Sequence, residues 1–375
     1  MKELGIYIHI PFCQKKCEYC DFISFENEYE LIENYIESLI LEIEKESKKI
    51  AKEQYEITTI YFGGGTPSFI DSKYIIKILE KIKQNFNLNN PEITIEINPG
   101  TVNEEKLKHY FENGINRISI GLQETDNNLL KMLGRIHRFE EFLNTYNLAR
   151  KVGYKNINVD LMIGLPNQTM FNIEKSLEKI IELNLKHISV YSLILEDYTK
   201  LNDRVVNKEL ELPSENLERR MYWKVKEELE KNDFIQYEIS NFSKKGFESK
   251  HNVNCWKQKE YLGFGLAAHS YFNNIRYANV HKLNEYLESN GDDKIIQEKQ
   301  TREETMKEYM LLGLRKIDGV SISEFEQKFR IHPLFYFRFE ISKLEEKDLI
   351  EVDLDNIKLT KKGLDLANQV FQEFV

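Results

Sequence analysis

The stretch PFCQKKCEYCDF, residues 11–22, decides the class of this chain, and it follows directly on the apolar run GIYIHI at residues 5–10. Its cysteines, Cys13, Cys17 and Cys20, are separated by three and then two residues. Thiolates at this spacing can hold three irons of a [4Fe–4S] cluster and leave the fourth iron open. A structural zinc site is the alternative. Zinc usually recruits a second cysteine or histidine pair nearby, whereas the remaining cysteine, Cys255, is distant in sequence.

Length and composition fit one barrel with an appendage. The chain has 375 residues, of which 41% are hydrophobic and 30% charged, with a net charge of −10. Basic residues form no block, which disfavours a protein that binds nucleic acid through its phosphates. No apolar run reaches the roughly 18 residues of a transmembrane helix. Because an oxygen-sensitive cluster needs a reducing compartment, we expect a cytoplasmic protein.

Apolar runs alternate with amphipathic segments in the first half of the chain, which predicts parallel strands covered by helices. The expected strands are residues 5–10, 57–62, 92–97, 117–122, 156–163 and 187–194, and the expected helices are 28–52, 71–86, 103–113, 138–152 and 169–184. Six such units can form a partial barrel or an open doubly wound sheet. Polar residues favour the barrel, because Glu96, Gln123 and Asp160 lie near strand ends where a ligand site is expected.

The second strand ends in YFGGGTPS, residues 61–68. Three successive glycines remove every Cβ at the strand exit, so a ligand can contact the backbone itself. A phosphate-binding loop is the alternative, but that motif needs a GK[ST] sequence that is missing here.

The pattern changes after residue 232. Short strand-like pieces, YEIS, HSYF and IRYAN, surround a loop-like HNVNCW at residues 251–256. Helices are expected at residues 302–316, 321–329 and 334–349, and the tail from 349 to 371 has the pattern of a winged helix. We therefore expect a barrel domain of residues 1–235 and a C-terminal α+β domain of residues 236–375. Residues 341–375 carry eight acidic and five basic side chains, which favours a structural or partner-binding role over DNA binding.

These motifs together resemble those of the radical SAM superfamily, whose members bind S-adenosylmethionine (SAM) at the open iron of a [4Fe–4S] cluster. The resemblance is carried by IYIHIPFCxxxCxYCDF, GGGTPS, RISIGLQE followed by LGRIH, DLMIGLPNQT, HNxxxW and LLGLR. Within the superfamily the chain is similar to the oxygen-independent coproporphyrinogen oxidase family from about residue 4 to residue 363, and most to its haem chaperone branch. The fold that this implies is α/β, a partial (β/α)6 TIM-like barrel followed by the C-terminal domain.

The resemblance implies a set of site residues. Cys13, Cys17 and Cys20 would hold the cluster, and the positions that match SAM-contacting positions of the family are Tyr7, Tyr19, Gly64, Gly65, Thr66, Glu96, Gln123, Arg135 and Asp160. Arg135 can offer its guanidinium to a carboxylate, or it can form an ordinary surface salt bridge. No residue is assigned a catalytic role.

The haem chaperone branch has the motif HNxxYW, and here Cys255 replaces the tyrosine. The resemblance implies that His251 contacts haem, since imidazole is a common axial ligand and a thiolate can also serve. A lone histidine satisfied within a loop is the alternative. Phe22 stands where the oxidase has a further cysteine, which favours the chaperone branch.

The function implied is a haem chaperone that binds a [4Fe–4S] cluster, SAM and haem as cargo. It would deliver haem to a recipient haem protein that the sequence does not identify, with flavodoxin or ferredoxin as electron donor. The alternative is an oxygen-independent coproporphyrinogen III oxidase, in which a 5′-deoxyadenosyl radical starts the decarboxylation of a propionate side chain. Whether the protein is an enzyme therefore stays open at the level of sequence.

Overall fold

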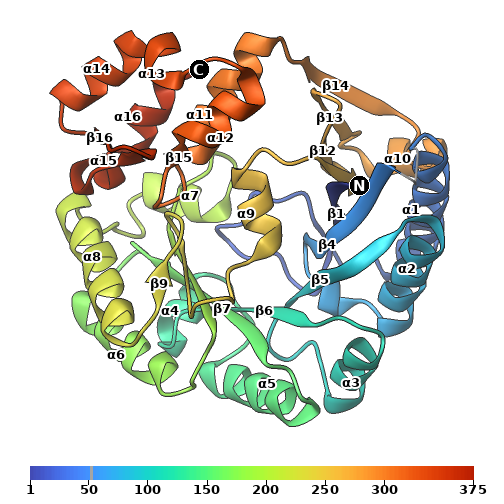
Figure 1. The fold of residues 1–375 in the computed structure, drawn as a ribbon. Coiled ribbons are helices and arrows are strands. Elements are labelled where there is room, and N and C mark those ends of the chain that lie inside the picture. Colours follow the sequence, from blue (N-terminus) through green and yellow to red (C-terminus); the bar gives the residue numbers. More distant parts are fainter. Residues whose placement is uncertain (51–53) are drawn as a thin grey trace.

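The structure is a computed structural model that describes residues 1–50 and 54–375 (Figure 1). Its centre is a curved sheet with six neighbouring parallel strands. These are β1 (Lys2–Ile10), β4 (Tyr55–Gly64), β5 (Leu88–Ile97), β6 (Arg117–Gln123), β7 (Asn156–Ile163) and β8 (His187–Ser192). All six predicted strands are present, and the predicted partial barrel is confirmed.

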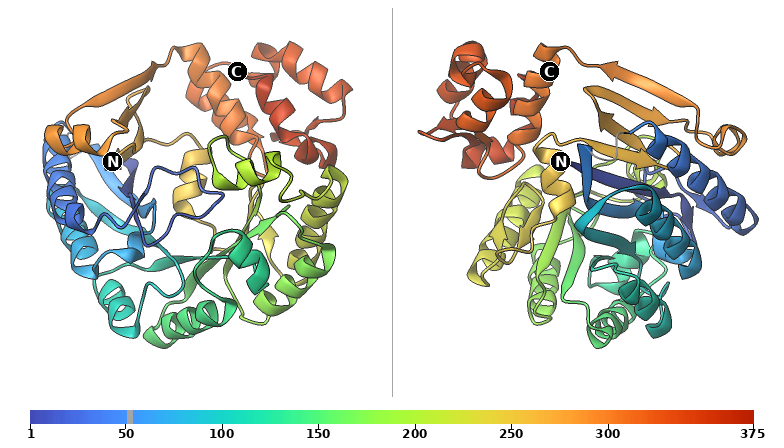
Figure 2. Two further views of the ribbon diagram at one scale, coloured as in Figure 1. Left: turned by 180° about the vertical axis from the view of Figure 1, so that it is seen from behind. Right: turned by 45° about the vertical axis from the view of Figure 1, so that its right-hand side comes forward.

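Helices cover the outer face of these strands (Figures 1 and 2). They are α1 (Ile32–Lys48), α2 (Ser72–Asn85), α3 (Glu104–Glu112), α5 (Phe139–Val152), α6 (Met170–Ile181) and α8 (Glu215–Lys231), with the short α4 (Asn127–Met132) and α7 (Lys200–Val206) in connections. Side-chain caps begin several of them, and the Asn103 side chain accepts from the Lys106 backbone N–H at the start of α3. Residues 51 and 52 of the predicted helix 28–52 lie outside the described residues.

Later parts of the chain extend both edges of the same sheet. Beside β1 lie β11 (Tyr261–Phe264), β12 (His269–Phe272), β13 (Ile275–Asn279) and β14 (Lys294–Lys299), and beside β8 lie β10 (Asn241–Ser243) and β9 (Ile235–Gln236). The strand predicted at YEIS is wrong. The strand pairing there is at Ile235 and Gln236, and Glu238 forms only an isolated bridge with Lys316.

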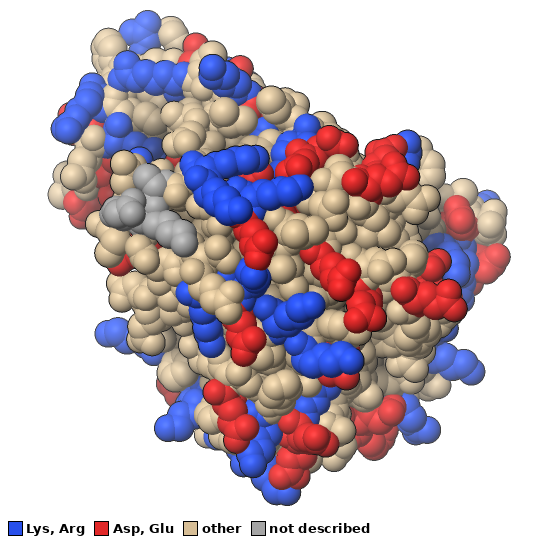
Figure 3. Space-filling model, turned by 90° about the vertical axis from the view of Figure 1, so that its right-hand side faces the viewer, with Lys and Arg blue, Asp and Glu red and all other residues tan. Residues whose placement is uncertain are grey.

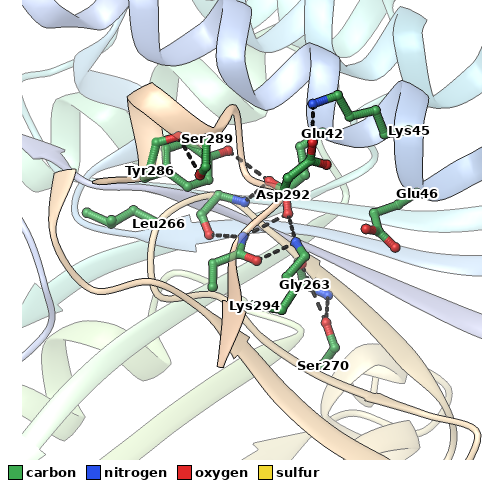
Figure 4. A network of polar contacts seen from close by, with 12 residues as sticks. Glu42, Lys45, Glu46, Gly263, Leu266, Ser270, Tyr286, Ser289, Asp292 and Lys294 are labelled. Carbon is green, nitrogen blue, oxygen red and sulfur yellow. Dashed lines mark hydrogen bonds and ion pairs between the residues drawn. The ribbon is translucent and has the colours of Figure 1, made fainter. Parts of the chain in front are cut away.

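A buried carboxylate fastens α1 to this sheet extension (Figure 4). Glu42 is 1% exposed and accepts hydrogen bonds from the Gly265 backbone N–H at 2.9 Å and the Tyr286 hydroxyl at 2.8 Å. Asn279 Nδ2 donates to it at 2.8 Å, and Lys294 provides the opposite charge. The α10 helix (Leu283–Ser289), which contributes Tyr286, lies against α1 as a result. A fully partnered buried ion pair of this kind fixes register between elements.

The C-terminal elements form a second hydrophobic core. They are α11 (Arg302–Gly313), β15 (Val320–Ser321), α12 (Ile322–Phe329), α13 (Pro333–Tyr336), α14 (Arg338–Glu346), β16 (Ile350–Val352), β17 (Asn356–Leu359), α15 (Lys361–Asp365) and α16 (Ala367–Gln372). The three-stranded sheet β15–β17–β16 with its preceding helices matches the predicted winged-helix-like tail. Phe242, Leu262 and Tyr286 still pack in the first core. The domain division at residues 235 and 236 stays a prediction.

The segment HNVNCW, predicted as a loop, is helical in α9 (Lys250–Trp256). The Ser249 side chain accepts from the Asn252 backbone N–H and begins the helix. Ser249 lies before the motif HNVNCW, so the motif by itself gave no sign of a helix start. Within the described residues, no helix combines the length and apolar character needed to cross a membrane.

Candidate functional site

The three predicted cluster cysteines lie on the loop after β1, at the carboxyl ends of the parallel strands. Cys13 ends β2 (Phe12–Cys13), which pairs with β3 (Phe25–Glu26), and it is 6% exposed. A turn brings Cys17 and Cys20 together, since the Cys20 backbone N–H donates to Cys17 O at 3.2 Å. Burial raises the pKa of Cys13, and burial raises the pKa of Cys20 to about 11. These two sulfurs therefore stay protonated at neutral pH unless a metal binds them.

Each of two cysteine sulfurs receives a hydrogen bond from a side chain. Thr66 Oγ1 donates to Cys13 Sγ at 3.4 Å, and Arg135 Nη1 donates to Cys17 Sγ at 3.4 Å. Among the described residues, no three His, Cys, Asp or Glu side chains lie close enough to share one metal ion. A [4Fe–4S] cluster instead places each thiolate on its own iron.

The glycine-rich strand end packs tightly against the cysteine loop. Gly64 has φ +107°, and a Cβ there would lie 2.6 Å from the ring of His9. A Cβ on Gly65 would lie 2.9 Å from Ile10 O, the atom that accepts the Gly65 backbone N–H. Only glycine allows this approach of strand end and loop, and Thr66 is placed beside Cys13 as a consequence.

Arg135 lies in the connection after α4, and its guanidinium is held on three sides. Besides Cys17, it donates through Nη2 to Gly121 O at 2.5 Å and to Asn98 Oδ1 at 2.8 Å. These contacts place the Arg135 side chain at the cysteine loop, in hydrogen bonds instead of the surface salt bridge weighed as the alternative. Gln123 is beside it at the end of β6, and its φ of +73° is unusual for a residue other than glycine.

The strand interiors contribute two carboxylates below this rim. Tyr61 donates its hydroxyl to Glu96 Oε1 at 2.9 Å, and Asn158 Nδ2 donates to Asp160 Oδ1 at 2.7 Å. Burial and the nearby Asp160 raise the pKa of Glu96 to about 7, and burial also raises the pKa of Asp160. Tyr7, also predicted, stacks on Tyr61 with ring centroids 6.3 Å apart. Because no cation among the described residues neutralises Glu96 and Asp160 fully, their carboxylates can favour the binding of a positively charged ligand group.

Tyr19, predicted to lie near SAM, is partly buried and packs against the cluster of Leu133 and Leu201. This apolar cluster joins the cysteine loop to α7. Arg204 in α7 forms an ion pair with Glu18, which strengthens the same connection. The cysteine loop is therefore held by α7 as well as by the glycine-rich end of β4.

Sequence reasoning missed Asn98 and Tyr61. Asn98 directly follows β5 and hydrogen-bonds both Thr66 and Arg135. The rule that selected Glu96, a polar residue near a strand end, would also have selected Asn98. Tyr61 gave no such signal because an aromatic residue within a strand is ordinary. A small hollow open to solvent adjoins Asn98, and its lining includes Cys17, Thr66, Asn98, Thr101, Arg135 and His137.

His251 lies apart from the cysteines. Its Nδ1 shares a hydrogen bond of 2.9 Å with Thr59 Oγ1, and its ring packs on Tyr61 at 5.2 Å. The backbone N–H of His251 donates to Glu92 Oε1 at 3.3 Å. Burial lowers the pKa of this histidine to about 4, so the imidazole is neutral. Thr59 and Glu92 precede Gly64 and Glu96 in their strands, so α9 contacts the barrel upstream of the rim (Figures 1 and 2).

A three-cysteine loop over a partial barrel, with polar groups at the strand ends, defines the radical SAM class. The family model described as "Radical SAM superfamily" matches residues 7–180, and the model described as "HemN C-terminal domain" matches residues 300–366. The Escherichia coli coproporphyrinogen III oxidase HemN has the same fold, with a TM-score of 0.86 at 22% identity, covering 100% of this chain and 90% of that chain.

The full-length relatives narrow the class to one family. "Heme chaperone HemW" of Lactococcus lactis is 39% identical over 100% of this chain and 98% of its own length. "Heme chaperone HemW" of Bacillus subtilis is 36% identical, covering 98% of each chain. The chain belongs to the heme chaperone HemW family.

Proposed function

We propose that this chain binds a [4Fe–4S] cluster and SAM at the barrel rim, and that it carries haem to a recipient haem protein. One observation supports this most directly. The chain matches haem chaperones along its whole length, and the same chain carries Phe22 where the oxidase has a further cysteine. The comparisons therefore favour a chaperone over the coproporphyrinogen oxidase.

The site residues have distinct roles in this proposal. Cys13, Cys17 and Cys20 ligate three irons, and the bound cluster supplies one electron and an open iron for SAM. The backbone of Gly64 and Gly65, with Thr66, would receive the methionine end of SAM, and Tyr19 would lie near its adenine. The carboxylates of Glu96 and Asp160, whose pKa values are raised by burial, would receive polar or cationic groups of the ligand. Tyr7, Gln123 and Arg135 complete the proposed set.

Haem is the proposed cargo, with His251 as a contact. In the described conformation His251 is 8% exposed and its Nδ1 is engaged by Thr59. Ligation of iron by Nε2 therefore requires a displacement of α9, a helix of only seven residues. Burial raises the pKa of Cys255 to about 11, so this thiol, like that of Cys20, is protonated at neutral pH unless a metal binds it. The cluster and SAM positions all precede residue 236 and His251 follows it, although His251 itself packs on β4 and β5 of the barrel.

The surface gives little support to nucleic acid as a partner. On the face shown in Figure 3, basic and acidic side chains are interspersed, without a large block of one sign. The whole chain has a net charge of −10. Proteins that bind phosphates need a concentrated positive surface. We propose a recipient haem protein and a flavodoxin- or ferredoxin-type electron donor instead, within the reducing cytoplasm that an exposed cluster requires.

An anaerobic haem titration of cluster-loaded protein tests the assignment of His251. We expect saturable binding of about one haem per chain in the wild type and a tenfold or larger loss of affinity in His251→Ala, the scale expected when an axial ligand is removed. His269→Ala is the matched control, because His269 is exposed on β12 and its Nδ1 shares a hydrogen bond with Gln297 Oε1. Equal affinity in wild type and His251→Ala would remove His251 from the haem site, and absence of saturable binding would contradict the carrier function.

A further inference from the structure

A single amide joins the two side chains that hydrogen-bond the cluster cysteines. Asn98 Nδ2 donates to Thr66 Oγ1 at 2.9 Å, and Asn98 Oδ1 accepts from Arg135 Nη2 at 2.8 Å. Thr66 and Arg135 then donate to Cys13 and Cys17, each at 3.4 Å. Asn98 is therefore linked to Cys13 through Thr66 and to Cys17 through Arg135, with no hydrogen bond of its own to either sulfur.

The amide determines the direction of the Thr66 hydroxyl. A hydroxyl group has one hydrogen to donate and two lone pairs that accept. Because Asn98 Nδ2 has no lone pair to offer, Thr66 Oγ1 must accept from it, and its hydrogen is left for Cys13 Sγ. Only this orientation of the amide also presents an oxygen to the guanidinium of Arg135.

The same amide also fixes the guanidinium. Arg135 Nη2 donates to both Asn98 Oδ1 and Gly121 O, which leaves Nη1 directed at Cys17 Sγ. The planar guanidinium cannot rotate about one of these bonds without losing the others. Its Nε has no hydrogen-bond partner among the described residues, so the side chain is held entirely through its two terminal nitrogens.

The backbone of Asn98 is itself anchored. Its N–H donates to Ser68 Oγ at 3.2 Å, and its carbonyl oxygen accepts from the Thr101 backbone N–H at 3.1 Å and from the Thr101 hydroxyl at 2.7 Å. The amide is thus presented from a rigid turn immediately after β5. The Asn98 amide is thus held in place by groups of the protein itself, which preorganises the donors Thr66 and Arg135.

We propose that Asn98 is a positioning residue that raises the reduction potential of the cluster by directing the hydroxyl of Thr66 and the guanidinium of Arg135 onto the cysteine sulfurs. Hydrogen bonds to ligating sulfur stabilise the more negative, reduced state and so raise the potential. The inference rests on the proposed function, because it assumes that these cysteines hold a cluster.

The test is a SAM-free potentiometric titration of reconstituted protein, followed by electron paramagnetic resonance of the reduced cluster. Asn98→Leu keeps a similar volume and removes both hydrogen bonds. We expect its midpoint to move to more negative potential. At the wild-type midpoint, the ratio of reduced to oxidised cluster should fall about tenfold, which equals about 59 mV for a one-electron couple. Asn113→Leu is the matched control, since it makes the same change of amide to leucine in the outer helix segment, where Asn113 Nδ2 donates to His109 O at 2.8 Å.

A second variant separates positioning from a general effect of polarity. Thr66→Val removes the hydrogen bond to Cys13, so Asn98→Leu should shift the potential less in a Thr66→Val background than in the wild type. Thr66→Ser retains the hydroxyl and should keep the wild-type potential. Equal shifts of Asn98→Leu in both backgrounds would mean that the amide does not act through the hydroxyl, which would overturn this part of the proposal.

Iron and sulfide analysis distinguishes the possible failures. A wild-type protein that retains no cluster would contradict the proposed function. A cluster-loaded Asn98→Leu with the wild-type midpoint would overturn only the role of Asn98. If Asn98→Leu retains no cluster, Asn98→Ala is measured instead, and loss of the cluster in both variants would show that Asn98 builds the site and does not tune it.

Discussion

Glu96 gives the site a pH dependence whose direction follows from its surroundings. Burial and the Asp160 carboxylate raise the pKa of Glu96 from 4.5 to about 7. Below that pH the carboxyl is protonated, and a cationic ligand must displace the proton in order to pair with it. We therefore expect the affinity for SAM to fall about tenfold for each pH unit below about 7. Isothermal titration calorimetry under anaerobic conditions, between pH 5.5 and 7.5, measures this dependence.

The same shift affects folding with the opposite sign. The folded protein binds the Glu96 proton more tightly than the unfolded chain, so this residue lowers the free energy of unfolding as pH rises from about 4.5 to about 7. Glu96→Gln is the control for both effects. It should bind SAM weakly and with little dependence on pH in this range. A wild-type affinity that does not change with pH would show that Glu96 takes no part in binding.

Single residues could be located from the sequence where their chemistry allows few alternatives, as for cluster-binding cysteines and for glycines at a close backbone approach. The cysteines and the glycines lie together at the carboxyl ends of the strands, and Glu96 lies just below them, near the end of β5. The partners of these residues were less accessible to prediction. That Asn98 joins Thr66 to Arg135 depends on the packing of three connections that are distant in sequence, and no local pattern reports such a contact.

The attachment of α1 to the sheet extension depends on one buried charge pair. Replacing Lys294 by Met removes the cation next to Glu42 and leaves the carboxylate 1% exposed without its partner. We expect the free energy of unfolding to fall by about 3 kcal/mol, because an uncompensated buried charge is costly. Chemical denaturation followed by circular dichroism measures the change.

Lys45→Met is the matched control within the same network (Figure 4). Lys45 and Asp292 form an ion pair at 2.5 Å, but their side chains are 38% and 49% exposed. Solvent-exposed pairs contribute about 0–1 kcal/mol, so this variant should unfold nearly as the wild type does. Similar losses in both variants would mean that burial of Glu42 does not determine the strength of the connection.

The long periodic elements were predicted correctly, and so were the short strands β12 and β13, whereas α9 and β9 were not. Strands β4 to β8 are apolar runs buried along most of their length, and helices α2, α3, α5 and α6 each bury one face against the core. Both patterns are visible in the sequence. The helix α9 has seven residues and no apolar stripe, and its start depends on the cap at Ser249. The strand β9 has two residues, and its position depends on pairing with β10, which the sequence does not reveal.

On the scale of the whole molecule, one sheet connects both predicted domains. Phe242 and Leu262 pack in the barrel core, whereas the second core begins at Met306. Packing therefore favours a structural division near residue 300 and not at residue 236, the boundary expected from the sequence. Composition indicated the change of pattern after residue 232, but it could not show that the following strands return to both edges of the barrel sheet.

The central claim is that one chain holds a cluster at the rim and haem as cargo. Native mass spectrometry of anaerobically reconstituted protein mixed with haem tests it most directly, because each bound group adds its own mass. We expect a dominant species that contains one [4Fe–4S] cluster and one haem per chain. A species with the cluster but without haem, at haem concentrations well above that of the protein, would contradict the carrier function and favour radical chemistry on a porphyrinogen.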